Sequence, residues 1–177
     1  MSESIRLVNQ QLAFCQAQLL SARTSAGFNQ RCTLQACKLQ MHVLMQAYLA
    51  EIAERHGLKW QIKLADLTES LAQLHNLLEQ KTLVSADFNH LQQLINEPAA
   101  WRYWLQLYQS ALTAGTQTPL SPVLSDAAAV ENSIIASSQT SADRLNADAV
   151  TQIELMHELL TALQEVIQIQ RQNKIEF

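Results

Sequence analysis

The sequence predicts an all-α protein, a single helical bundle of about five to six helices with a long Ser/Ala-rich connection before the last helix. Nearly half of its 177 residues are apolar, but Gly and Pro number only three each, so the turn residues that a β-protein needs are scarce. Gln occurs 22 times, often beside Ala and Leu, and all three residue types favour helices. A chain of this length fits one domain spanning residues 1–177.

The first part of the chain predicts two antiparallel helices. Apolar residues form one narrow seam over residues 4–23, and a broader apolar stripe runs through residues 34–52. Gly57 is well placed to end the second helix in a left-handed conformation. Glu51 and Arg55 lie four residues apart on this helix, so we expect them to form an ion pair on its surface.

Three shorter helices are expected in the middle of the chain. Leucines at helical spacing predict a third helix over residues 64–78, and Ser85 is a suitable N-cap for a short fourth helix. Pro98 separates the fourth helix from the fifth, because proline is tolerated in the first turn of a helix but not in its interior. The fifth helix is expected to bury one apolar side, made of Trp101, Trp104, Leu105, Tyr108 and Leu112.

Residues 115–146 have a different composition from the rest of the chain. They are rich in Ser, Thr and Ala and contain two prolines, so they offer too little apolar surface to offset the entropy of ordering. We expect a partly mobile connection within the single domain. The following segment, residues 150–167, has so wide an apolar face that we expect it to be a central helix.

Charge and composition exclude several classes of partner. The net charge of −4 argues against nucleic acid, which binds clustered Lys and Arg. Polar residues interrupt the apolar stretch near the N-terminus, and no secretory signal is visible, so we expect no membrane partner. An odd number of cysteines, three, favours free thiols and a cytoplasmic location.

Charge is also unevenly distributed along the chain. No acidic residue occurs between Glu3 and Glu51, whereas acids outnumber bases after residue 115. The simplest interpretation is that the two ends of the chain pack together and that their electrostatic fields complement each other.

No pattern of reactive side chains predicts chemistry. Cys32, Cys37 and His42 follow each other at steps of five, which point in different directions on a helix and do not form a metal site. Glu154 and His157 supply only one of the two Glu-x-x-His motifs that a four-helix di-iron site needs. Phosphate-binding loops and nucleophile elbows are also missing. We therefore expect no catalytic residue, no metal and no cofactor.

Two groups of residues are candidates for an interaction surface. Trp101, Trp104 and Tyr108 share one side of the fifth helix, whereas Tyr103 projects to the opposite side, so we expect Tyr103 to be an exposed contact residue. The last helix places Glu154 and Glu158 together on its polar side. This acidic side is either a solvated face or a docking surface for a basic partner.

A resemblance to a known family rests on four stretches of packing residues. They are Arg6-Leu-Val-Asn-Gln-Gln-Leu12, Gln40-Met-His-Val-Leu-Met-Gln-Ala-Tyr48, Pro98-Ala-Ala-Trp101 with Tyr108, and Arg171 to Phe177. These stretches resemble a bacterial family of small all-helical proteins, domain of unknown function 6586. The resemblance covers most of the chain and implies a helical fold, but it implies no catalytic residue and no activity.

These observations leave two functional hypotheses. The first is a non-enzymatic cytoplasmic helical protein that acts through protein–protein interaction or self-association. The alternative is a small-ligand-binding or hydrolytic helical-bundle enzyme with a pocket between the second, fifth and sixth helices. In that case His42 or His75 and Tyr48 would line the pocket.

Overall fold

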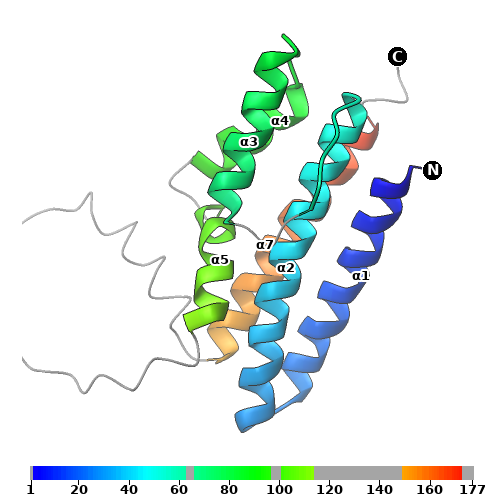
Figure 1. The fold of residues 1–177 in the computed structure, drawn as a ribbon. Helices are drawn as coiled ribbons and strands as arrows, with labels where there is room; N and C mark the ends of the chain where they lie inside the picture. The colour runs from blue at the N-terminus through cyan, green and yellow to red at the C-terminus, as the bar shows by residue number, and fades with distance from the viewer. Residues whose placement is uncertain (1, 63–65, 97–100, 114–148, 173–177) are drawn as a thin grey trace, which may run out of the picture.

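The computed structural model describes residues 2–62, 66–96, 101–113 and 149–172 (Figure 1). Within these ranges the chain forms six helices that pack together and no strands, which confirms the predicted all-α fold. The helices are α1 (Glu3–Thr24), α2 (Gly27–Arg55), α3 (Leu67–Gln80), α4 (Ala86–Asn96), α5 (Arg102–Thr113) and α7 (Ala149–Gln172). The predicted connection over residues 115–146 and the predicted break at Pro98 lie outside the described residues. None of the described helices is both long and apolar enough to cross a membrane.

The centre of the bundle is α2, the longest helix. It packs against α1 as an antiparallel hairpin and also contacts α3, α5 and α7 (Figure 1). The prediction that the last helix is central was wrong, because α7 packs mainly on α1 and α2 at one side of the bundle. The wide apolar face of α7 is explained by these two neighbours. The prediction that the two ends of the chain pack together is confirmed by the contact between α1 and α7.

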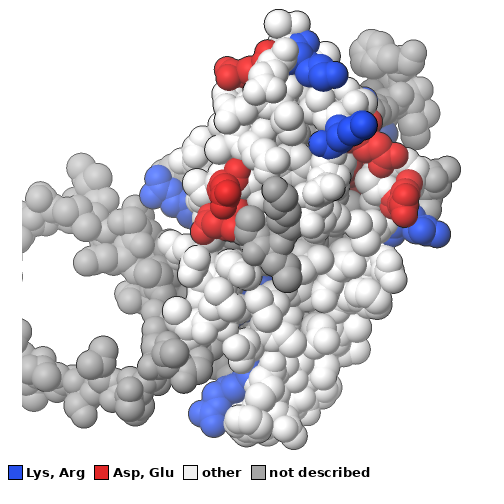
Figure 2. Space-filling model, in the orientation of Figure 1, with Lys and Arg blue, Asp and Glu red and all other residues white. Residues whose placement is uncertain are grey.

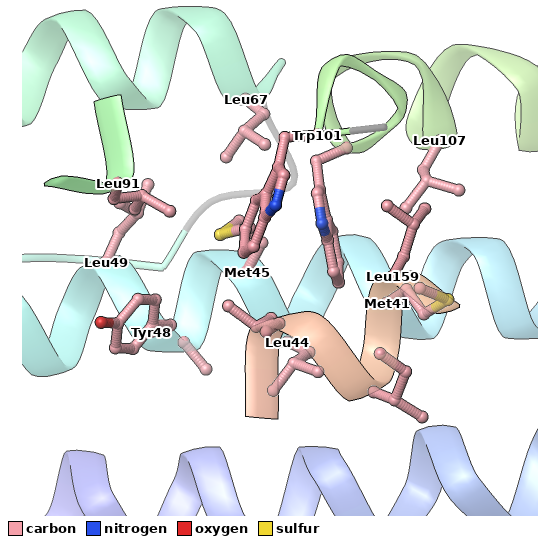
Figure 3. Packing of buried hydrophobic residues seen from close by; sticks show 14 of the residues in the cluster. Met41, Leu44, Met45, Tyr48, Leu49, Leu67, Leu91, Trp101, Leu107 and Leu159 are labelled. Carbon is pink, nitrogen blue, oxygen red and sulfur yellow. The ribbon is translucent and has the colours of Figure 1, made fainter. Parts of the chain in front are cut away.

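Two layers of side chains meet around α2. In Figure 3, Met45 and Leu49 point from α2 toward Leu67, Leu91 and Trp101, which come from the α3–α5 side of the molecule. All five are buried. The other side of α2 faces α1 and α7. Burial of apolar surface on both sides of one helix is the main stabilising contribution to such a fold.

Several helix ends are fixed by the capping residues that the sequence provides. Gly57 has a positive φ of 65°, and the amide of Leu58 donates to the carbonyl of Ala53 at 3.0 Å, so the predicted left-handed end of α2 is confirmed. The predicted N-cap of α4 is confirmed as well, since the Ser85 hydroxyl accepts from the Phe88 amide at 3.2 Å. Asp66 caps α3 in the same manner, through the Thr68 amide.

The buried side of α5 differs from the prediction. Its buried residues are Tyr103, Trp104, Leu107 and Ala111. Leu112, which was expected inside, is 54% exposed. The helix is therefore rotated by about one residue position relative to the predicted apolar side. Because α5 contacts α2, α3 and α4, it buries more of its circumference than a helix with one neighbour.

A buried lysine connects α2 to the end of α5. Lys38 is 4% exposed, and its Nζ donates to the Ser110 hydroxyl at 2.9 Å. Beside it, the Gln35 side-chain amide donates to the carbonyl of Ala111 at 2.7 Å. These donors lie at the last turn of α5, where carbonyl groups lack partners within the helix. Burial lowers the pKa of Lys38, an effect that the neighbouring Cys37 partly opposes.

We predict that Lys38→Met leaves the free energy of unfolding at neutral pH unchanged or raises it by about 1 kcal/mol, because methionine avoids burying an ammonium group. In the wild type, the folded protein holds the Lys38 proton less tightly than the unfolded chain. Wild-type stability should therefore rise between the lowered folded pKa and the ordinary value of 10.5.

Urea denaturation of both proteins at several pH values above neutrality measures this difference. The advantage of Lys38→Met should shrink as the pH approaches 10.5, the ordinary pKa of a lysine. A variant that is clearly less stable at neutral pH would show instead that the contact with Ser110 outweighs the burial of charge.

Candidate functional site

Charged groups gather at the end of the molecule where α1 begins and α2 ends. Figure 2 shows several acidic and basic groups near this end and a mostly uncharged surface over the lower part of α1 and α2. The uncharged region agrees with the absence of acidic residues between Glu3 and Glu51. The charged end is therefore a candidate for a polar site.

Glu51 of α2 is the centre of an ion-pair cluster at this end. Its carboxylate accepts two hydrogen bonds from Arg171 of α7, at 3.0 and 2.6 Å. It also accepts one from Arg55. The guanidinium of Arg55 donates in turn to Asp87 of α4, and Arg171 donates to Asn9 of α1 at 2.8 Å. The cluster thus joins four helices.

The Glu51–Arg55 pair was predicted on the surface of α2, but the structure buries it. The side chain of Glu51 is 1% exposed and that of Arg55 is 8% exposed. Burial lowers the pKa of Arg55, but the hydrogen bonds and charges of Glu51 and Asp87 outweigh burial and raise it overall. The prediction was wrong because helical spacing identifies the pair but not the helices that cover it.

A second carboxylate at this end holds the start of α1. Glu54 accepts a hydrogen bond from the backbone amide of Ser4 at 3.2 Å, so it supplies a partner for an amide that the helix itself leaves free. Hydrogen bonds from Ser4 and Ser2 lower the pKa of Glu54 against a smaller effect of burial. A negative charge at a helix N-terminus is also favoured by the helix dipole.

An open pocket of about 420 Å³ lies beside these groups; we call it the end pocket. Its lining consists of Ser2, Ser4, Ile5, Glu51, Glu54, Arg55 and Arg171. The volume is in the range of small-molecule sites. However, the charged groups on its wall already have partners within the protein, as the bonds above show.

Tyr48 lies close to the charged cluster without bonding to it. Its hydroxyl is buried and has no hydrogen-bond partner among the described residues. Burial raises the pKa of Tyr48, and the nearby negative charge of Asp87 raises it further, while Arg55 acts in the opposite direction. The ring therefore stays neutral at physiological pH.

A second hollow, of about 260 Å³, lies between α1 and α7; we call it the α1–α7 groove. It is lined by Gln16, Leu19, Leu20 and Arg23 from α1 and by His157, Leu160, Thr161 and Gln164 from α7. A hydrogen bond between the side chains of Gln16 and Gln164 crosses it at 3.4 Å. Leu20 is 63% exposed.

The predicted aromatic contact residue is not on the surface. Tyr103 is only 2% exposed, so the prediction that it forms an exposed contact was wrong. The physical reason is that the buried side of α5 is rotated toward Tyr103, where α2, α3 and α4 are the neighbours of this helix. Trp101 and Trp104 are buried beside it, with ring centroids 6.3 Å apart.

The residues expected to line a pocket between α2, α5 and α7 pack against other side chains. His42 is fully buried and stacks on Tyr108 at a centroid distance of 4.7 Å. Tyr48 is also fully buried. His75 lies elsewhere, stacked on Phe88 and within 3.3 Å of Glu79. Neither the end pocket nor the α1–α7 groove has any of these three predicted residues in its lining.

The acidic side of the last helix is placed as predicted. Glu154 and Glu158 are both exposed on α7, and Glu165 is exposed on the same helix. Glu154 lies one helical turn before the groove residue His157 on α7. The acidic residues therefore lie next to the α1–α7 groove.

The cysteines are separated by their surroundings. Cys15 and Cys37 are buried, whereas Cys32 is exposed. Burial raises the pKa of the Cys37 thiol to about 12, so it stays protonated and unreactive. Within the described ranges, no three or more His, Cys, Asp or Glu side chains come together in a way that could hold a metal ion.

Comparisons of the chain with protein-family models, curated proteins and solved structures gave no match. The resemblance to domain of unknown function 6586 therefore stays a prediction.

The sequence interpretation missed several residues of the ion-pair cluster and of the α1–α7 groove. Asp87 and Arg171 belong to the cluster through contacts between distant parts of the chain, for which local spacing carries no signal. Leu20 and Arg23 fall outside the apolar seam of the first helix, and this position was the one available sign that they face solvent or a groove.

Proposed function

We propose that this protein is a cytoplasmic, non-enzymatic helical protein that acts by binding another protein or a second copy of itself. The observation that carries the proposal is the α1–α7 groove, where an exposed Leu20 lies among polar and charged side chains. Apolar residues surrounded by a polar rim are typical of protein-binding surfaces. The three free thiols are compatible with a reducing compartment.

Charges beside the groove support the same proposal. Arg23 lines it on α1, and the exposed Glu154 lies next to it on α7. Neither side chain has an ion pair among the described residues. Charges at the rim of an interface select the partner and speed association more than they add affinity.

The end pocket gives weaker support to small-molecule binding. Glu51 is bonded to two arginines, and Glu54 to the Ser4 amide. A ligand would have to break these bonds to reach the charges, and the loss of a buried charge pair costs free energy. The pocket is therefore better explained as the edge of a structural cluster.

Leu20→Glu in the full chain tests the proposal. A charge in the groove should weaken partner capture or self-association by at least about tenfold, because an apolar contact is replaced by a desolvated carboxylate. The fold should be unaffected, because the substituted side chain is exposed. Affinity capture from native lysate and sedimentation of the purified protein measure the two forms of binding.

Leu112→Glu is the matched control, since Leu112 is a similarly exposed leucine, 54% exposed, on α5. It should keep the binding that Leu20→Glu loses. A wild-type protein that sediments as a clean monomer and captures nothing would refute the proposal, and equal losses in both variants would place the binding surface elsewhere.

A further inference from the structure

Two hydrogen bonds and one shared hollow define the relative position of α1 and α7. Arg171 donates to Asn9 near the charged end, and Gln16 bonds Gln164 in the middle. Arg23 and His157 line the same groove at the far end. The residue number rises along α1 as it falls along α7, so the two helices run antiparallel, with Arg23 level with His157.

The solvent-facing sides of these two helices differ in charge. On α1, exposed arginines occur at positions 6 and 23, and no acidic residue follows Glu3. On α7, the exposed charged residues are glutamates, including Glu154 and Glu165. Arg23 and Glu154 have no ion pair among the described residues. After Glu3, α1 therefore carries only positive charge, and it lies beside the exposed glutamates of α7.

We propose that the occupant of this face is a second copy of the chain, related by a two-fold axis that runs parallel to α1 and α7. This inference rests on the proposed function and names its partner. A rotation about such an axis places α1 of each copy on α7 of the other, so that basic and acidic helices meet twice. An axis perpendicular to the helices would instead place α1 on α1 and bring like charges together.

The register of the pair follows from the contacts within one copy. Rotation about an axis parallel to the helices keeps each residue at its own level, so Arg23 of one copy lies level with His157 of the other. Glu154 is one helical turn away, which is within reach of an arginine side chain. Each two-fold pair thus contains two Arg23–Glu154 contacts. Leu20 of each copy faces the groove of the other, which contains Leu19 and Leu160.

The area of this face is sufficient for a specific dimer. Helices of 22 and 24 residues are about 33 and 36 Å long, and two adjacent helices are about 20 Å wide. The face therefore covers about 700 Å² per copy, close to the roughly 800 Å² per partner of a standard interface. Polar side chains dominate it, so we expect a reversible dimer that weakens as salt concentration rises.

Two charge reversals and their mixture test the proposal. Arg23→Glu and Glu154→Arg should each weaken dimerisation of the full chain by at least about tenfold, because both contacts of the homodimer become repulsive. In an equimolar mixture of the two variants, a heterodimer has attractive charges at both contacts. The mixture should therefore dimerise with nearly wild-type affinity. Sedimentation velocity over a range of protein concentrations measures all four samples.

Arg102→Glu and Glu69→Arg are control reversals, because both residues are exposed on helices away from this face. They should dimerise like the wild type. The proposed dimer would be refuted by a wild type that is monomeric. It would also be refuted by a mixture that stays monomeric although each variant is folded. If the wild type is monomeric but captures a protein that Leu20→Glu does not, the proposed function stands and the second copy is excluded; if it captures nothing, both proposals fail.

Discussion

Glu51→Ala is expected to lower the free energy of unfolding by about 3–5 kcal/mol, which is the usual effect of removing one partner from a buried ion pair. Glu51 is fully buried and binds the guanidinium groups of Arg55 and Arg171. Without its carboxylate, Arg55 keeps only Asp87 as a negative partner among the described residues. A buried positive charge would then be left incompletely compensated, which is more costly than the loss of one hydrogen bond.

Urea denaturation followed by circular dichroism measures this loss. Glu69→Ala is the control, because Glu69 is exposed on α3, away from the α1–α7 face, and its removal should change stability by less than about 1 kcal/mol. Glu51→Gln, which keeps the shape of the side chain without its charge, should fall between the wild type and Glu51→Ala. A loss below about 1 kcal/mol for Glu51→Ala would mean that water solvates the two arginines and that the cluster contributes little.

This cluster shows where sequence interpretation of the molecule stops. The four-residue spacing of Glu51 and Arg55 predicted their ion pair correctly, because helical geometry is local. Whether a pair is exposed depends on which helices cover it. Asp87 of α4 and Arg171 of α7 reach the pair from 32 and 120 positions away in the sequence, and no periodicity within one segment contains that information.

The fold was more predictable than the site because its signals are local. Apolar spacing and the capping residues Ser85 and Gly57 identified helices and their ends, and these features depend on neighbouring residues only. The arrangement of helices was less predictable. The wide apolar face of α7 suggested a central helix, but the centre is α2, where Lys38 and Gln46 are buried among the apolar residues and dilute the apolar signal.

Tyr103 gives the clearest example of the same limit at the level of one residue. Its position opposite the expected apolar side of α5 indicated exposure, but the buried side of α5 is rotated and includes Tyr103 and Leu107, while Arg102, Gln106 and Gln109 form the exposed side. The α1–α7 groove was missed for a related reason. Leu20 and Arg23 look like ordinary surface residues of an amphipathic helix until α7 is placed beside them.

Trp104→Ala is expected to destabilise the protein by about 3–5 kcal/mol, the range for removing a large aromatic side chain from a packed core. Trp104 is fully buried, and its ring centroid lies 6.3 Å from that of Trp101. The cavity left by the substitution is bordered by helices that are themselves fixed by other contacts, so it should close only in part.

Trp104→Phe separates the effect of packing from that of polarity. The indole nitrogen of Trp104 has no hydrogen-bond partner among the described residues, so phenylalanine loses volume without losing a hydrogen bond. The loss of unfolding free energy for Trp104→Phe should be less than half that for Trp104→Ala.

Trp60→Ala removes the same kind of side chain from a partly exposed position. Its loss of unfolding free energy should also be less than half that for Trp104→Ala. Thermal and urea unfolding of the three variants measure these differences, and a loss below about 1 kcal/mol for Trp104→Ala would show that α5 is not part of the stabilising core.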